Sequence, residues 1–118
     1  MAVNVLVIDD QKNIANMMKE YLQEHGMSSD VAFNGRSAIE MLQVKKYQVL
    51  LTDYKLPDLD GEQVMAKCKK IQPDLKVIII TAHREIISRL RSKIGRTFQV
   101  IEKPCRAKTI LAAIQKML

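Results

Sequence analysis

A β-branched-rich run that ends in two carboxylates, VNVLVIDD at residues 3–10, opens the chain. Such a run is typical of a strand covered on both faces in a parallel sheet. The segment after it has helical spacing, with apolar side chains at Ile14, Met17, Met18, Tyr21 and Leu22. This spacing predicts a helix that directs those side chains inward. Gly26 is suited to end the helix, because glycine tolerates the left-handed conformation.

The alternation of strand and helix repeats along the rest of the chain. A weaker strand is expected around residues 29–33, and further strands at residues 49–52, 77–80 and 98–101. Asn34 is placed to cap the second helix, and Asp60 with Gln63 has the pattern of a capping box before the third. The fourth helix is expected to direct inward Ile86, Ile87, Leu90 and Ile94. Five strands alternating with five helices predict an α/β fold, a doubly wound parallel sheet with helices on both faces.

Length and composition limit the class of protein. With 118 residues, of which 47% are hydrophobic, the chain is expected to form a single domain spanning residues 1–118. No apolar stretch approaches the roughly 20 residues of a membrane span, and no basic leader precedes the first strand. The two cysteines, Cys68 and Cys105, are too few for a disulfide framework. We therefore expect a cytoplasmic protein. A monomer or a weak dimer is a separate expectation, which composition does not establish.

Charge is distributed unevenly along the sequence. Residues 1–60 carry six basic and nine acidic side chains, whereas residues 61–118 carry thirteen and four. Much of the excess lies on and after the fourth helix and at the start of the fifth, at Arg84, Arg89, Arg91, Lys93, Arg96, Arg106 and Lys108. This basic surface fits either an acidic protein partner or plain solvated charge. We do not expect direct nucleic-acid binding, because no reading helix and no stacking aromatics accompany the charges.

The expected ends of four strands carry polar residues. Ligands of open parallel sheets collect at the carboxyl ends of the strands, so these residues are expected to meet. Three close carboxylates repel one another unless a cation lies between them, and an oxygen-only set favours Mg²⁺ over zinc. A divalent cation, a hydroxyl and an ammonium beside a carboxylate could orient a phosphoryl group for transfer to that carboxylate. The residues are Asp9, Asp10, Asp53, Thr81 and Lys103.

Four segments resemble, in order and spacing, the receiver domain of two-component response regulators: VLVIDD, LLTDYKLPDLDG, IIITA and VIEKP. The resemblance covers essentially the whole chain and implies a flavodoxin-like sheet of strand order 2-1-3-4-5. It implies that Asp53 is the phosphorylated residue. It also implies that Mg²⁺ is held by Asp10, Asp53 and the backbone carbonyl of Lys55, with Asp9 acting mainly through water. Thr81, the amide of Ala82 and Lys103 would contact the phosphoryl group, and the bond before Pro104 would be cis.

The resemblance further implies a Mg²⁺-dependent phosphoacceptor switch. The donor would be a sensor histidine kinase or a phosphotransfer protein. The signal would pass to a downstream protein partner or output domain through the face made by the fourth helix, fifth strand and fifth helix. Such a protein is not an enzyme beyond promoting its own phosphorylation and slow dephosphorylation. A stand-alone regulator, a phosphorelay intermediate and a receiver from a longer protein all fit the sequence.

Some positions depart from the pattern of this family. Val100 stands where an aromatic residue often provides half of a threonine–aromatic switch, and Phe98 lies on the same face of the strand two residues earlier. Cys105 replaces a common phenylalanine. Lys55 and His83 occupy positions that tune the lifetime of the phosphate, where they either border the path of an attacking water or are plain loop residues.

Two other functions stay open at this stage. The first is a phosphatase with an aspartyl nucleophile, although Asp53-Tyr54-Lys55 lacks the second acid of the Asp-x-Asp pattern in haloacid-dehalogenase-type enzymes. The second is a receiver-like module that only binds proteins. Turnover of a phosphomonoester would favour the first, and failure to bind Mg²⁺ would favour the second.

Overall fold

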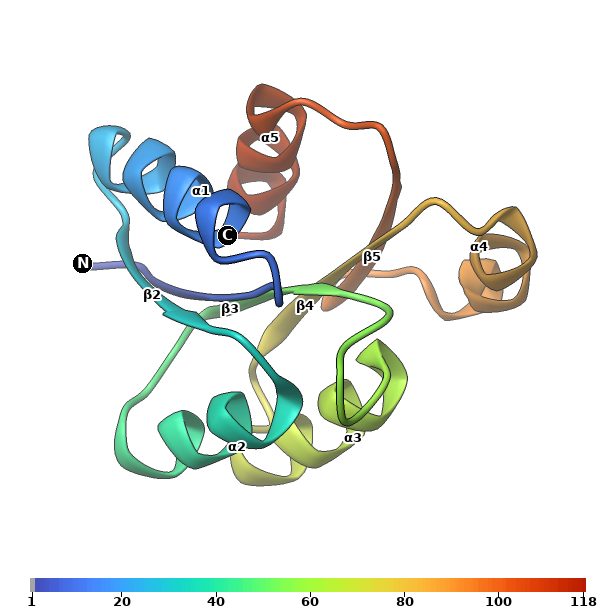
Figure 1. Ribbon diagram of the computed structural model, residues 1–118, viewed down its shortest axis with the longest axis horizontal. Helices are drawn as coiled ribbons and strands as arrows, with labels where there is room; N and C mark the ends of the chain where they lie inside the picture. The colour runs from blue at the N-terminus through green and yellow to red at the C-terminus, as the bar shows by residue number, and fades with distance from the viewer. Residues whose placement is uncertain (1) are drawn as a thin grey trace.

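A computed structural model describes residues 2–118, and its elements alternate as expected (Figure 1). The strands are β1 (Asn4–Ile8), β2 (Ser28–Ala32), β3 (Val49–Asp53), β4 (Lys76–Thr81) and β5 (Phe98–Glu102). The helices are α1 (Lys12–Glu24), α2 (Gly35–Val44), α3 (Gly61–Ile71), α4 (Arg84–Leu90) and α5 (Ala107–Met117), with a 3₁₀ turn η1 (Arg91–Lys93) after α4. All strand pairs are parallel in the order β2-β1-β3-β4-β5, which confirms the expected fold class.

Local sequence signals set the ends of several helices. The capping box before α3 is present, because the Asp60 carboxylate accepts the Gln63 N–H (2.9 Å) and the Gln63 side chain accepts the Asp60 N–H (3.0 Å). Asn34 caps α2 by accepting the Ser37 N–H at 2.8 Å. Gly26 has a φ of 82° just after α1, the left-handed conformation expected of a glycine stop.

The sheet separates two apolar layers. Helices α1 and α5 cover one face, and α2 and α3 cover the other (Figure 1). The side chains of β1 alternate between the layers, with Leu6 and Ile8 in the α2–α3 core and Val5 and Val7 in the α1–α5 core. Among the helices within residues 2–118, none combines the length and the apolar character needed to cross a membrane.

Three apolar side chains expected in the core lie at the surface instead. Ile14 and Met17 are 44% and 68% exposed, because the face of α1 that packs on the sheet is centred on Ala15 and Leu22. The apolar stripe read from the sequence is wider than the arc that this helix can bury. Ile94 is 39% exposed because α4 ends at Leu90 and the turn η1 breaks the helical spacing before residue 94 is reached.

The strand register brings the carboxyl ends of the central strands to one edge. Ile8 pairs with Thr52, Asp53 with Ile80, and Thr81 with Glu102. The residues that directly follow β1 and β5 therefore lie beside the last residues of β3 and β4. This alignment positions the candidate site.

Candidate functional site

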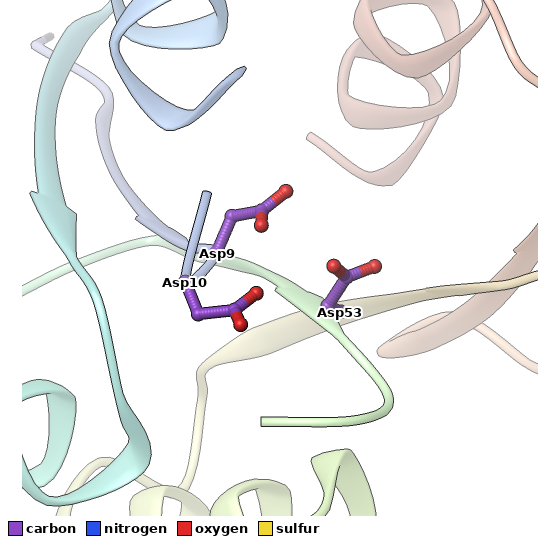
Figure 2. A group of neighbouring side chains, drawn as sticks. All are labelled: Asp9, Asp10 and Asp53. Atoms are coloured by element: carbon purple, nitrogen blue, oxygen red, sulfur yellow. The ribbon is translucent and has the colours of Figure 1, made fainter. Parts of the chain in front are cut away.

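Three carboxylates converge at the end of β1 and β3. Asp9 and Asp10 follow β1, Asp53 is the last residue of β3, and one oxygen of each lies within 4.8 Å of the others. Figure 2 shows the three side chains directed into the same space. Asp9 is buried, Asp53 is partly buried and Asp10 is exposed, so the cluster opens to solvent on one side. The structure thus brings together the acidic residues singled out from the sequence.

Lys103 completes the charged cluster from the other side. Its Nζ lies 2.6 Å from Asp53 Oδ1. The Lys103 N–H donates to the carbonyl oxygen of Thr81 at 2.9 Å, which fixes the lysine backbone at the end of β4. Burial lowers the pKa of Lys103, but the hydrogen bond and the charge of Asp53 outweigh it, so the pKa is raised and the ammonium stays charged. The Lys103–Pro104 bond is cis, as the resemblance implies.

Thr81 and the loop after β4 form the rest of the rim. The Thr81 hydroxyl oxygen accepts the His83 N–H at 3.2 Å, which leaves the hydroxyl proton available for another acceptor. A cleft of about 200 Å³ joins these residues to Asp53, and its lining includes Asp53, Lys55, Thr81, Ala82, His83 and Lys103. Lys55 and His83 therefore border the same space as the Asp53 carboxylate.

The chemistry of the acidic cluster fits a hard divalent cation. Burial raises the pKa of Asp9, and the charges of Asp53 and Asp10 act in the same direction, against the hydrogen bond from the Gln11 N–H (3.0 Å) and the charge of Lys103. The cluster is therefore strained electrostatically without a cation. All of its ligand atoms are oxygens, and its open side leaves room for water, which suits Mg²⁺. Residues Asp9, Asp10 and Asp53, with the Lys55 carbonyl, would hold it.

Because ionised Asp9 is unfavourable in this cluster, Asp9→Asn is expected to change the stability of the metal-free protein. In EDTA at pH 7, the variant should exceed the wild type in free energy of unfolding by about 1 kcal/mol. The pKa of Asp9 is higher in the folded protein than in the unfolded chain. Ionisation of Asp9 therefore lowers the free energy of unfolding as the pH rises above the pKa of an ordinary aspartate. Urea titrations at pH 7 and pH 4 measure the difference, which should shrink at the lower pH. Mg²⁺ should then stabilise the wild type more than the variant; equal stability in EDTA at pH 7 would refute the cation-dependent strain.

The aromatic half of a threonine–aromatic switch is absent at the expected strand. Val100 is partly buried among the core residues on the α2–α3 face, and Phe98 is 4% exposed in the same core. Phe98 is at the start of β5, where it pairs with Val77, whereas Thr81 pairs with Glu102 at the other end of that strand. Phe98 is therefore a packing residue at the far end of the strand.

A groove that the sequence did not indicate lies beside Asp53, between α1 and α5. It has a volume of about 470 Å³ and extends from Asp53 and Lys103 to a mainly apolar lining that includes Ile14, Met18, Pro104, Cys105 and Ile110. Burial raises the pKa of the Cys105 thiol, so this cysteine stays protonated and acts as an apolar wall. The groove depends on how two helices far apart in sequence pack together, so no local motif could reveal it.

Comparison with known proteins identifies the family. The family model described as the response regulator receiver domain matches residues 5–115. The response regulator receiver protein CpdR of Brucella abortus is 30% identical over 114 residues, covering 97% of this chain and 95% of CpdR. Sporulation initiation phosphotransferase F of Bacillus subtilis is 29% identical over 114 residues, covering 97% and 92%.

Solved structures agree with this result. The response regulator protein TrrA of Thermotoga maritima, solved in complex with Mg²⁺-BeF, is 29% identical, has a TM-score of 0.85 and covers 98% of this chain and 99% of its own. A CheY-like receiver domain from Methanospirillum hungatei, 23% identical, has the same fold with a TM-score of 0.85, over 98% of this chain and 93% of its own. The chain belongs to the response regulator receiver domain family.

Proposed function

We propose that this receiver domain is a Mg²⁺-dependent phosphoacceptor switch with Asp53 as the acceptor. The observation that carries the proposal is the pairing of Lys103 Nζ with Asp53 Oδ1 at 2.6 Å beside two further carboxylates. One aspartate is thereby placed between a fixed ammonium and an acidic cluster suited to a divalent cation. TrrA, the relative solved in complex with Mg²⁺-BeF, supports a role for Mg²⁺ in this proposal.

The proposed reaction transfers a phosphoryl group to a carboxylate oxygen of Asp53. The oxygen forms a bond to phosphorus as the bond between phosphorus and the donor breaks, and the donor leaves with that electron pair. Bound Mg²⁺ would neutralise charge on the phosphoryl oxygens. Lys103 would orient and neutralise another of these oxygens, and the Thr81 hydroxyl would donate to the transferred group. Asp53 returns to its free carboxylate when water hydrolyses the acyl phosphate, so no separate substrate is turned over.

Receiver domains interact with histidine kinases or phosphotransfer proteins. We propose that such a protein, acting in the cytoplasm, is the donor here. The apolar groove beside Asp53 and the exposed Ile14 and Met17 on α1 offer a surface next to the acceptor on which a donor could pack. A protein donor would thus be distinguished from a small phosphodonor by contacts outside the charged site.

We propose that the signal leaves through the face formed by α4, β5 and α5, toward an acidic protein partner. A polar network supports this route, because it joins the residue after the acceptor to α4. Arg89 Nη2 contacts Glu62 Oε1 at 2.6 Å and donates to Tyr54 Oη at 3.0 Å, while Lys93 Nζ lies 3.4 Å from Glu62 Oε2. The hydrogen bond from Arg89, helped by Tyr54 and Lys93 and opposed by burial, lowers the pKa of Glu62 to about 2. Glu62 therefore remains an anion that holds α4 and η1 to α3.

Incubation with acetyl phosphate and Mg²⁺, followed by intact-mass measurement, tests the proposed function. One phosphoryl group per chain should appear, and omission of Mg²⁺ should reduce labelling strongly. Because an acyl phosphate is labile to base, mild base should remove the group. Multiple turnovers of a phosphomonoester would instead favour a phosphatase, and a protein that neither binds Mg²⁺ nor becomes labelled would be a binding module.

A further inference from the structure

The loop between Asp53 and α3 is fastened to helix α2 by Asp58. We infer that Asp58 is a positioning residue for the cation site, since it fixes the loop that carries the Lys55 carbonyl. The inference rests on the proposed function, in which this carbonyl is a Mg²⁺ ligand. Asp58 does not belong to the acidic cluster, and it acts through the backbone of another element.

Asp58 makes two hydrogen bonds to the first turn of α2. Its Oδ1 accepts the Gly35 N–H at 2.9 Å and its Oδ2 accepts the Arg36 N–H at 3.0 Å. The next amide, Ser37 N–H, donates to the Asn34 side chain, and Ala38 N–H makes the first i→i−4 bond of the helix, to the Asn34 carbonyl. The amides of Gly35, Arg36 and Ser37, which have no partner within the helix, are therefore satisfied, two of them by a residue from a distant loop. Burial raises the pKa of Asp58, but these amides and neighbouring ones outweigh it, so the pKa is lowered and the carboxylate stays ionised.

Close packing holds the same two segments together. Leu59, the residue after Asp58, lies against Gly35 so tightly that a Cβ on residue 35 would be 2.9 Å from Leu59 Cδ1 and from Val64 Cγ2. The absence of a side chain at Gly35 is what lets the loop approach the helix. The anchor thus combines two charge-assisted hydrogen bonds with an apolar contact.

Backbone hydrogen bonds across the loop connect the anchored residue Asp58 to Lys55. Gly61 N–H donates to the Tyr54 carbonyl at 2.6 Å, Lys55 forms a bridge with Asp60, and Leu56 N–H donates to the Leu59 carbonyl at 3.2 Å. These backbone bonds form successive rungs, with Asp58 at the tip and Lys55 next to the base. When the tip is fixed to α2, the Lys55 backbone has little freedom to move relative to Asp53.

Calorimetric titration with Mg²⁺ alone tests the inference on the full chain. Asp58→Ala should weaken Mg²⁺ binding by about tenfold, the scale typical of residues that orient metal ligands. Asp58→Asn removes the same charge but keeps one of the two oxygens that accept from α2, so it should recover part of the affinity. Asp74→Ala, at an exposed carboxylate in the turn after α3, is the matched charge control and should stay within about twofold of the wild type.

The outcomes distinguish the hydrogen-bonding role of Asp58 from the effect of its negative charge. They also distinguish failure of this inference from failure of the proposed function. Wild-type affinity in folded Asp58→Ala would overturn the inference. Equal loss in Asp58→Asn and Asp58→Ala would also overturn it, because charge alone would then account for the effect. If Asp58→Ala fails to fold, Asp58→Asn is compared with Asp74→Asn. A partial loss of Mg²⁺ affinity that Asp74→Asn lacks supports the inference, whereas wild-type affinity or a tenfold loss in Asp58→Asn overturns it. A wild-type chain that binds no Mg²⁺ would instead refute the proposed function.

Discussion

Asp53→Asn is expected to abolish labelling by acetyl phosphate completely. The amide oxygen that replaces the carboxylate is a poor nucleophile, and no other carboxylate of the cluster has the Lys103 ammonium at 2.6 Å. The substitution keeps nearly the same volume at the end of β3, so the fold should be retained. Intact-mass measurement after incubation with acetyl phosphate and Mg²⁺ gives the result directly.

Asp74→Asn provides the matched control for this experiment. It makes the same chemical change at an exposed turn and should be labelled like the wild type. Circular dichroism of both variants checks that the fold is unchanged. A phosphoryl group that persists in Asp53→Asn, especially on Asp9 or Asp10, would show that the acceptor has been assigned to the wrong carboxylate.

Lys103→Met is expected to slow labelling by about 100-fold, the range found when one preorganised donor to a developing charge is removed. The same variant should bind Mg²⁺ at least as tightly as the wild type. The ammonium holds Asp53 Oδ1 at 2.6 Å and repels a neighbouring cation, so its loss frees a ligand and removes that repulsion. Opposite effects on rate and on Mg²⁺ affinity would distinguish a role in orienting the phosphoryl group from general damage to the site.

Lys108→Met, at an exposed position in the first turn of α5, controls for the change in net charge. It should leave both the labelling rate and the Mg²⁺ affinity near those of the wild type. If Lys103→Met is labelled at the wild-type rate, the lysine is only the resting partner of Asp53. If its Mg²⁺ affinity falls, the ammonium supports the cluster in some way other than competition for Asp53.

Part of the candidate site could be predicted because strand ends are readable in the sequence. Apolar runs locate the strands, and in a parallel sheet every carboxyl end lies on the same edge, so Asp9, Asp53 and Lys103 could be expected on one edge of the sheet. The capping box of Asp60 and Gln63 was equally readable, because both partners lie within one helical turn. Signals of this kind depend only on residues close in sequence or on a general rule of topology.

The predictions that were wrong concern how much of an apolar face is covered. Ile14, Met17 and Ile94 have helical spacing, yet each is exposed. Burial depends on which neighbour packs against a helix and on where the helix stops, and α4 stops at Leu90, before its apolar spacing does. Periodicity describes the helix alone, so it could not set either limit.

The alternation of elements, the parallel sheet and the polar residues at its edge could be predicted from the residues alone, because hydrophobic period and strand-end position are local properties. The 2.6 Å pairing of Lys103 with Asp53, the groove between α1 and α5, and the attachment of Asp58 to Gly35 and Arg36 arise only in the folded chain. Each of these joins segments that are far apart in the chain. Their geometry follows from helix packing and strand register, which no short stretch of sequence encodes.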